Sequence, residues 1–188
     1  MNEQRTNKHR GFSLFELMAV VTIVGIIAAL AVPNIRPIVQ SMRIRSESSA
    51  LSAALARARS ESSRVQKATV LCVRKSGLDQ CDSGANWANG WLLFVDNNGD
   101  GAYAASDGDQ LLTSHAAVAS QLTLTNTFTS AGYVSFTASG NLSTVGSTVS
   151  GQEPEFRVCD DRTGGHGRRL SVATIGRVRV ETLSCPAT

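Results

Sequence analysis

The chain has 188 residues, of which 42% are hydrophobic, and a formal net charge of +3 at pH 7. This length allows one modest globular domain beyond an apolar segment. Because the net charge is small, it does not by itself predict a nucleic-acid partner.

A basic leader precedes an apolar segment at the start of the chain. Residues 1–11 carry most of their charge as Arg and Lys, and Glu16 is the only charged residue of residues 12–33. Crossing a bilayer takes roughly 20 apolar residues, and an ionisable residue inside such a span is read by default as functional. An ordinary secretory signal is the alternative, because Ala29-Leu30-Ala31 fits a cleavage site. Glu16 counts against it, since a charge there opposes insertion.

The run Gly11-Phe12-Ser13-Leu14-Phe15-Glu16-Leu17 resembles the class III signal of type IV pilins and type II secretion pseudopilins. The resemblance implies that residues 1–11 are a leader, which prepilin peptidase cleaves after Gly11, and that Phe12 becomes the methylated N-terminus. It also implies that Glu16 pairs with the charged N-terminus of a neighbouring pilin during assembly. A buried carboxylate is tolerable when it meets an opposite charge.

The same resemblance implies a location. The chain is expected in the inner membrane as a single-pass protein with its head in the periplasm, and then in a pilus at the cell surface. Its expected partners are other pilins and minor pilins, prepilin peptidase and the inner membrane.

Residues 34–67 are predicted to form the amphipathic half of a helix whose transmembrane and assembly half is residues 12–33. Leu51, Ala54, Leu55 and Ala58 recur at helical spacing and define one apolar stripe. A long helix of this kind, apolar in its first half and packed on a head in its second, is what pilins contain.

Residues 68–188 are predicted to form a β-rich head. Short apolar runs occur at 69–73 and 91–95, residues 122–128 alternate between apolar and polar, and residues 170–180 suggest two further strands. The predicted fold class is therefore α+β, a type IV pilin fold in which the helix packs on an antiparallel β-sheet head.

Four cysteines, all beyond the apolar segment, predict two disulfides in an oxidising compartment. They are Cys72, Cys81, Cys159 and Cys185. Three pairings are possible, and Cys72–Cys81 with Cys159–Cys185 is favoured because each closes a short local loop. We expect no metal ligation by these cysteines, because no C-x-x-C or Cys/His cluster occurs.

The head resembles the GspH/FimT group of minor pilins and pseudopilins. The residues that carry this resemblance are 89–101, beginning Asn89-Gly90-Trp91, followed by Asp109-Gln110-Leu111-Leu112. Together with the leader motif, the resemblance covers most of the chain.

Asp96, Asn98 and Asp100 fit the start of a calcium-binding loop of the EF-hand type. Position twelve of that loop is Asp107 instead of the usual Glu, and a strand is predicted where an EF-hand has a helix. Asn-Gly and Asp-Gly are also common hairpin residues. The loop is therefore predicted to be a turn, with calcium as the alternative.

Arginines concentrate near the C-terminus, where residues 157–179 hold six Arg against Asp160 and Asp161. Alternation on a strand predicts Arg177 and Arg179 on one face, with Val178 and Val180 on the other. With Arg168 and Arg169 they form a candidate strip for the phosphates of double-stranded DNA, since guanidinium groups match phosphate oxygens. A solvated face with ion pairs at its rim is the alternative.

The pattern Gly176-Arg177-Val178-Arg179 also resembles the FimT type of minor pilin, which is implicated in binding DNA for natural transformation. The expected function is a minor pilin at or near the tip of a type IV pilus that binds DNA without sequence specificity. The alternatives are a GspH-like pseudopilin of a type II secretion system and a FimU-like priming minor pilin without DNA binding. No catalytic residues, enzyme activity or cofactor are expected.

Overall fold

The computed structural model describes residues 12–82, 84, 86–127, 132–143 and 153–186. The chain divides into two compact units, Met1–Gln40 and Ser41–Thr188. Each unit is considered by itself below.

Helix α1, Leu14–Val65, begins in the first unit and ends in the second. Glu16 lies in its first turn, where a negative charge complements the helix dipole. The described large apolar side chains of the first unit are exposed, among them Phe12 just before the helix at 80% and Phe15 at 82%. Among the described residues, no helix meets the length and apolarity that a membrane crossing requires. The membrane segment expected at residues 12–33 therefore stays a prediction.

In the second unit, α1 buries the predicted stripe of Leu51, Ala54, Leu55 and Ala58. The helix stops at Val65 because Gln66 adopts a φ of 55°, the left-handed conformation that commonly ends helices. The helix therefore ends two residues before the predicted boundary at residue 67.

The predicted helix on an antiparallel β-sheet head is confirmed, and in the described residues eight strands follow α1 and divide between two antiparallel sheets. The first sheet has the order β3-β2-β1-β5 and the second β4-β6-β7-β8. The sheets separate because β4 pairs with β6 and not with β5, its neighbour along the chain. The bounds are β1 Ala68–Val73, β2 Trp91–Asp96, β3 Gln110–His115, β4 Thr123–Asn126, β5 Tyr133–Phe136, β6 Glu155–Cys159, β7 Gly164–Val172 and β8 Val178–Cys185, with short 3₁₀ helices η1 Trp87–Asn89 and η2 Ala105–Asp107.

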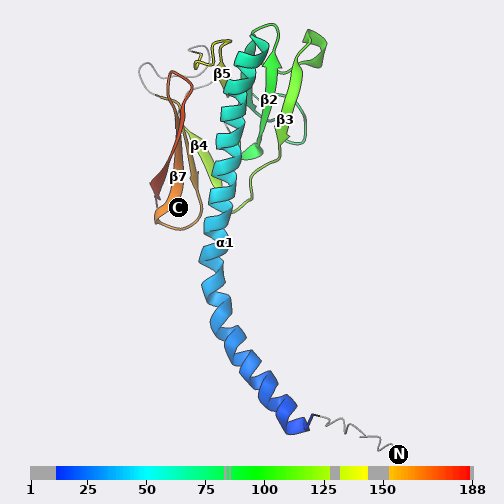
Figure 1. The fold of residues 1–188 in the computed structure, drawn as a ribbon, viewed down its shortest axis with the longest axis vertical. Helices are drawn as coiled ribbons and strands as arrows, with labels where there is room; N and C mark the ends of the chain where they lie inside the picture. Colours follow the sequence, from blue (N-terminus) through cyan, green and yellow to red (C-terminus); the bar gives the residue numbers. More distant parts are fainter. Residues whose placement is uncertain (1–11, 83, 85, 128–131, 144–152, 187–188) are drawn as a thin grey trace, which may run out of the picture. The chain divides into compact units, whose positions relative to one another are not determined.

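The main core lies between α1 and the two sheets. In Figure 1 the second half of α1 runs between β2 and β3 on one side and β4 and β7 on the other. Side chains from all three elements share one buried cluster, in which Trp87 meets Phe156 edge-to-face with ring centroids 4.7 Å apart. Burying aromatic rings of this size is a major source of stability, so the two sheets and the helix form one packed head.

Two disulfides brace this head, and the pairing favoured from the sequence is confirmed. Cys72 bonds Cys81, and Cys159 bonds Cys185. The first joins β1 to the loop after it, and the second joins the ends of β6 and β8.

Candidate functional site

The four arginines of the predicted DNA strip lie in three different places. Arg168 and Arg169 are consecutive in β7, so their side chains leave the sheet on opposite faces. Arg179 lies in β8 opposite Ser171, on the face that carries Arg169. Arg177 precedes β8, in the turn that joins it to β7.

The predicted alternation of β8 holds only within the strand. Val178 and Val180 lie opposite the buried residues Val172 and Leu170, as predicted. Val180 is nevertheless 47% exposed, because β8 is the edge strand of its sheet. The expectation that Arg177 and Arg179 share one strand face is wrong, because Arg177 lies outside the strand and lines a different groove.

Arg179 belongs to a face on which positive and negative charges balance. We call this surface the mixed-charge face. It is a hollow of about 510 Å³, and its charged lining residues are Glu153, Glu155, Arg157, Arg169, Arg179 and Glu181. The sequence count over 157–179 gave a strong positive bias because it excluded all three glutamates.

On the mixed-charge face, arginines form ion pairs with neighbouring glutamates. Arg157 Nε contacts Glu155 Oε1 at 2.6 Å, and Arg169 pairs with Glu181 across β7 and β8. The hydrogen bond from Arg169, followed by its charge, lowers the pKa of Glu181, and the same bond raises the pKa of Arg169. A phosphate that binds here has to compete with carboxylates already in contact.

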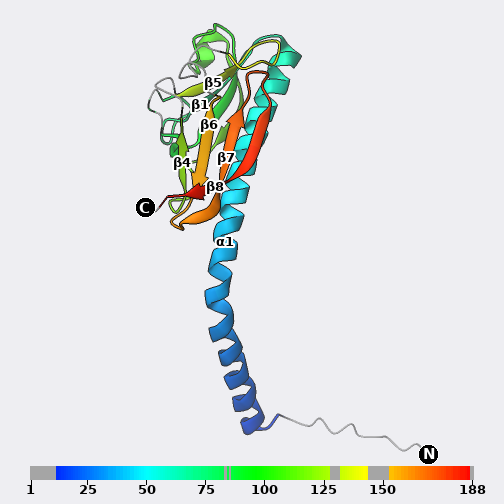
Figure 2. The same cartoon turned by 90° about the vertical axis from the view of Figure 1, so that its left-hand side faces the viewer.

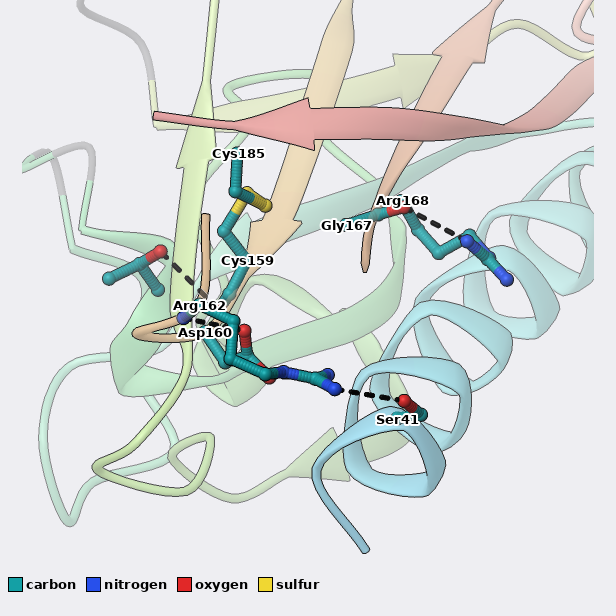
Figure 3. A network of polar contacts seen from close by, with 8 residues as sticks. Ser41, Cys159, Asp160, Arg162, Gly167, Arg168 and Cys185 are labelled. Carbon is teal, nitrogen blue, oxygen red and sulfur yellow. Dashed lines mark hydrogen bonds and ion pairs between the residues drawn. A yellow bond between two sulfur atoms is a disulfide. The ribbon is translucent and has the colours of Figure 1, made fainter. Parts of the chain in front are cut away.

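Arg168 and Arg162 make hydrogen bonds within the head, as Figure 3 shows. Arg168 Nη1 donates to the carbonyl of Gly167 at 3.0 Å. Arg162 pairs with Asp160 at 2.7 Å and donates to Ser41 Oγ of α1 at 3.2 Å. The contacts of Arg162 fasten the loop between β6 and β7 to the helix, which is a structural role.

Asp160 is buried, with only 2% of its surface exposed. Burial opposes its ionisation, but hydrogen bonds from the side chain and backbone of Arg162, with the charge of that guanidinium, outweigh the effect. The pKa of Asp160 consequently lies below its usual value. Asp160 is therefore a charged anchor inside the head.

Arg177 lines a second groove, together with α1. This Arg59–Arg177 groove has a volume of about 540 Å³. Its lining residues are Ser52, Ala56, Arg59, Ser60 and Ser63 of α1 with Gly176, Arg177 and Val178 of the β7–β8 hairpin. Figure 2 shows β7 and β8 beside this part of α1. No carboxylate is among the lining residues, so the groove is cationic.

The Arg59 side chain lies close to two glycines, Gly176 and Gly140. A Cβ at Gly176 would lie 2.2 Å from Gly140 O and 3.0 Å from Cδ and Nε of Arg59. One at Gly140 would lie 2.8 Å from Ser63 Oγ and 3.4 Å from Arg59 Cγ. Both glycines have a φ of 76°, which residues with a side chain rarely adopt. Arg59 was not among the predicted site residues. Its signal in the sequence is the stripe of small residues Ser52, Ala56 and Ser63 at helical spacing around it.

The Asp96 loop has the geometry of a turn. Both carboxylate oxygens of Asp96 accept backbone N–H groups, from Gly99 at 2.6 Å and Gly101 at 3.0 Å. The Asn98 side chain donates to Asp100 and Asp107. In the part of the chain that the structure describes, no group of three or more His, Cys, Asp or Glu side chains could hold a metal ion.

The predicted processing and assembly residues lie at the start of the first unit. Gly11 is outside the described residues, Phe12 precedes α1, and Glu16 is exposed in its first turn. Cleavage at Gly11 and pairing of Glu16 with another subunit remain predictions.

A helix packed on antiparallel strands with two disulfides, and an apolar N-terminal helical segment, define the class of type IV pilin-like proteins. The solved structures agree. Two crystal forms of the Pseudomonas aeruginosa type IV minor pilin FimU match with TM-scores of 0.54 and 0.51, at 27% and 28% sequence identity. Each match covers 73% of this chain, and 87% and 91% of the respective FimU chains.

The family models identify the group within this class. The model described as type II transport protein GspH matches residues 47–176, and the prokaryotic N-terminal methylation motif matches residues 6–32. The chain belongs to the GspH family, and thus to the GspH/FimT group of minor pilins and pseudopilins. A comparison with curated proteins finds no match.

Proposed function

We propose that this chain is a minor pilin of a type IV pilus, incorporated at or near the tip. The observation that carries the proposal is the similarity of most of the chain to FimU, a type IV minor pilin. The methylation motif over residues 6–32 supports the processing that such a subunit requires.

In this proposal the chain is first a single-pass protein of the inner membrane. Residues 12–33 are the inserted segment, and the head lies in the periplasm, where an oxidising environment maintains both disulfides. Prepilin peptidase cleaves after Gly11. Glu16 then pairs with the N-terminus of a neighbouring pilin, which compensates its charge within an apolar surrounding.

Deletion of the gene tests the choice between pilus and secretion system. Loss of surface pili with normal release of secreted proteins supports the minor pilin. Loss of exoprotein release with normal pili identifies a GspH-like pseudopilin instead. Mass spectrometry of the N-terminus is expected to find methylated Phe12, whereas a mature chain that begins at Val32 contradicts the pilin processing.

A second function, sequence-independent binding of double-stranded DNA for natural transformation, is proposed for the head. The exposed Arg177 and the cationic groove beside it favour this activity, because guanidinium groups bind phosphate oxygens. Arg168, Arg169 and Arg179 contribute less in this proposal, since Arg168 is half-buried with its guanidinium bonded to Gly167 and the other two lie among carboxylates.

The test is retardation of a DNA duplex by the full chain in a zwitterionic detergent. Arg177→Gln combined with Arg179→Gln is expected to abolish retardation and to leave the thermal unfolding of the head unchanged. A variant that still retards DNA at low salt as the unmodified chain does would exclude this pair from DNA binding. A FimU-like priming subunit is then the better description.

A further inference from the structure

We propose that the Arg59–Arg177 groove binds one phosphate group of a DNA backbone, with Arg59 of the helix as the partner of Arg177. This inference rests on the proposed DNA binding and specifies its site. The sequence pattern pairs Arg177 with Arg179. In the present proposal the partner of Arg177 is instead Arg59, which lies more than a hundred positions earlier in the chain.

The charges of the described residues favour this groove over the mixed-charge face. Arg59 and Arg177 have no ion-pair or hydrogen-bond partner for their guanidinium groups within the described part of the chain. On the mixed-charge face, in contrast, Arg157 and Arg169 already contact Glu155 and Glu181. Of these two surfaces, the groove is therefore the one that offers an anion two guanidinium groups with no carboxylate among its lining residues.

The other polar groups of the groove indicate which side chains can donate hydrogen bonds to a phosphate. Ser60 and Ser63 donate their hydroxyl protons to the carbonyls of Arg57 and Arg59. They leave the two guanidinium groups as the strong donors, and these bind phosphate oxygens with charge-assisted hydrogen bonds. The absence of a side chain at Gly176 leaves room for the Arg59 stem beside the hairpin turn.

The decisive test introduces one carboxylate at two neighbouring helix positions. Ala56→Glu places a negative charge in the groove, whereas Ala53→Glu makes the same change of net charge at an exposed position outside it. Binding of a short fluorescent duplex by the full chain in zwitterionic detergent is expected to weaken about tenfold at low salt in Ala56→Glu and less than about twofold in Ala53→Glu. Equal losses in both variants would overturn the site, because only net charge would then matter.

Neutral substitutions check the partner assignment. Arg59→Gln and Arg177→Gln are each expected to lower the slope of log affinity against log salt by about one, and Arg179→Gln to leave it unchanged. If Arg179→Gln lowers the slope and Arg59→Gln does not, the groove is wrong while DNA binding stands.

A probe without DNA separates the groove from the proposed function. Titration of inorganic phosphate into the isotope-labelled full chain is expected to shift the Nε–Hε signals of Arg59 and Arg177, and not that of Arg179. Shifts without retardation of DNA would contradict DNA binding alone. The absence of shifts at the groove arginines would contradict the site itself.

Discussion

Gly167 lies against the Cys159–Cys185 disulfide, and only a residue without a side chain fits there. A Cβ at this position would lie 2.5 Å from Cys185 Sγ and 3.0 Å from Cys159 Sγ. We predict that Gly167→Ala lowers the free energy of unfolding by about 1–3 kcal/mol, the usual cost of overpacking. Urea denaturation measures this change.

Gly165→Ala is the matched control, because nothing lies within 4 Å of a Cβ at Gly165. We expect its stability to stay within about 0.5 kcal/mol of the unmodified chain. Equal losses in both variants would show that the disulfide contact is unimportant.

Asp160 makes the stability of the head depend on acid pH. Its pKa is lower in the folded state than in the unfolded state, so its contribution is complete above an unfolded pKa of about 3.9 and is lost as the pH falls through the folded value. We predict that Asp160→Asn costs about 2 kcal/mol at neutral pH, because it removes the carboxylate that accepts charge-assisted hydrogen bonds from Arg162. Chemical denaturation from neutral pH to about pH 3 is the measurement.

The difference between this variant and the unmodified chain is expected to shrink as the pH falls below about 4, as the linkage requires. A difference that stays constant down to that pH would mean that the charge of Asp160 does not stabilise the fold.

At the scale of elements, the two disulfides close loops of different length. Cys72–Cys81 spans 9 residues and Cys159–Cys185 spans 26. Chain entropy predicts that replacing a pair by serine costs about 2.6 kcal/mol for the shorter loop and about 3.5 kcal/mol for the longer one. Thermal unfolding of the two double-serine variants tests the order, and a larger loss for Cys72–Cys81 would contradict the entropic account.

The elements that the sequence predicted well are those whose apolar residues all pack against a single surface. The buried stripe of α1 and the alternation in β4 follow directly from one apolar face meeting one core. The antiparallel partners were harder to predict. The sequence gives no signal that β4 joins β6 instead of β5, because both alternatives satisfy the same alternation.

The candidate site shows the same limit. Arg177 was found from a local motif, but its neighbour Arg59 comes from α1, and no local spacing connects two residues so far apart. Likewise, the carboxylates beside Arg169 and Arg179 come from the flanking positions Glu155 and Glu181. A charge count along one segment of the sequence omits the charged residues that neighbouring strands place beside that segment in the sheet.

At the scale of the whole molecule, the unit Ser41–Thr188 contains both disulfides and, among the described residues, every buried side chain of the main core. We predict that a non-specific protease acting on the full chain leaves a resistant fragment that begins close to residue 41. Intact-mass measurement identifies its ends. A fragment that begins beyond Leu51 would show that α1 is not firmly held in the core.

The close approach of Gly176 to Gly140 also bears on how related chains vary. A Cβ at position 176 would lie 2.2 Å from the carbonyl oxygen of Gly140, and both residues have a φ of 76°. Glycine at 140 and glycine at 176 should consequently be inherited together whatever residue stands at position 59, although the two are far apart in the chain.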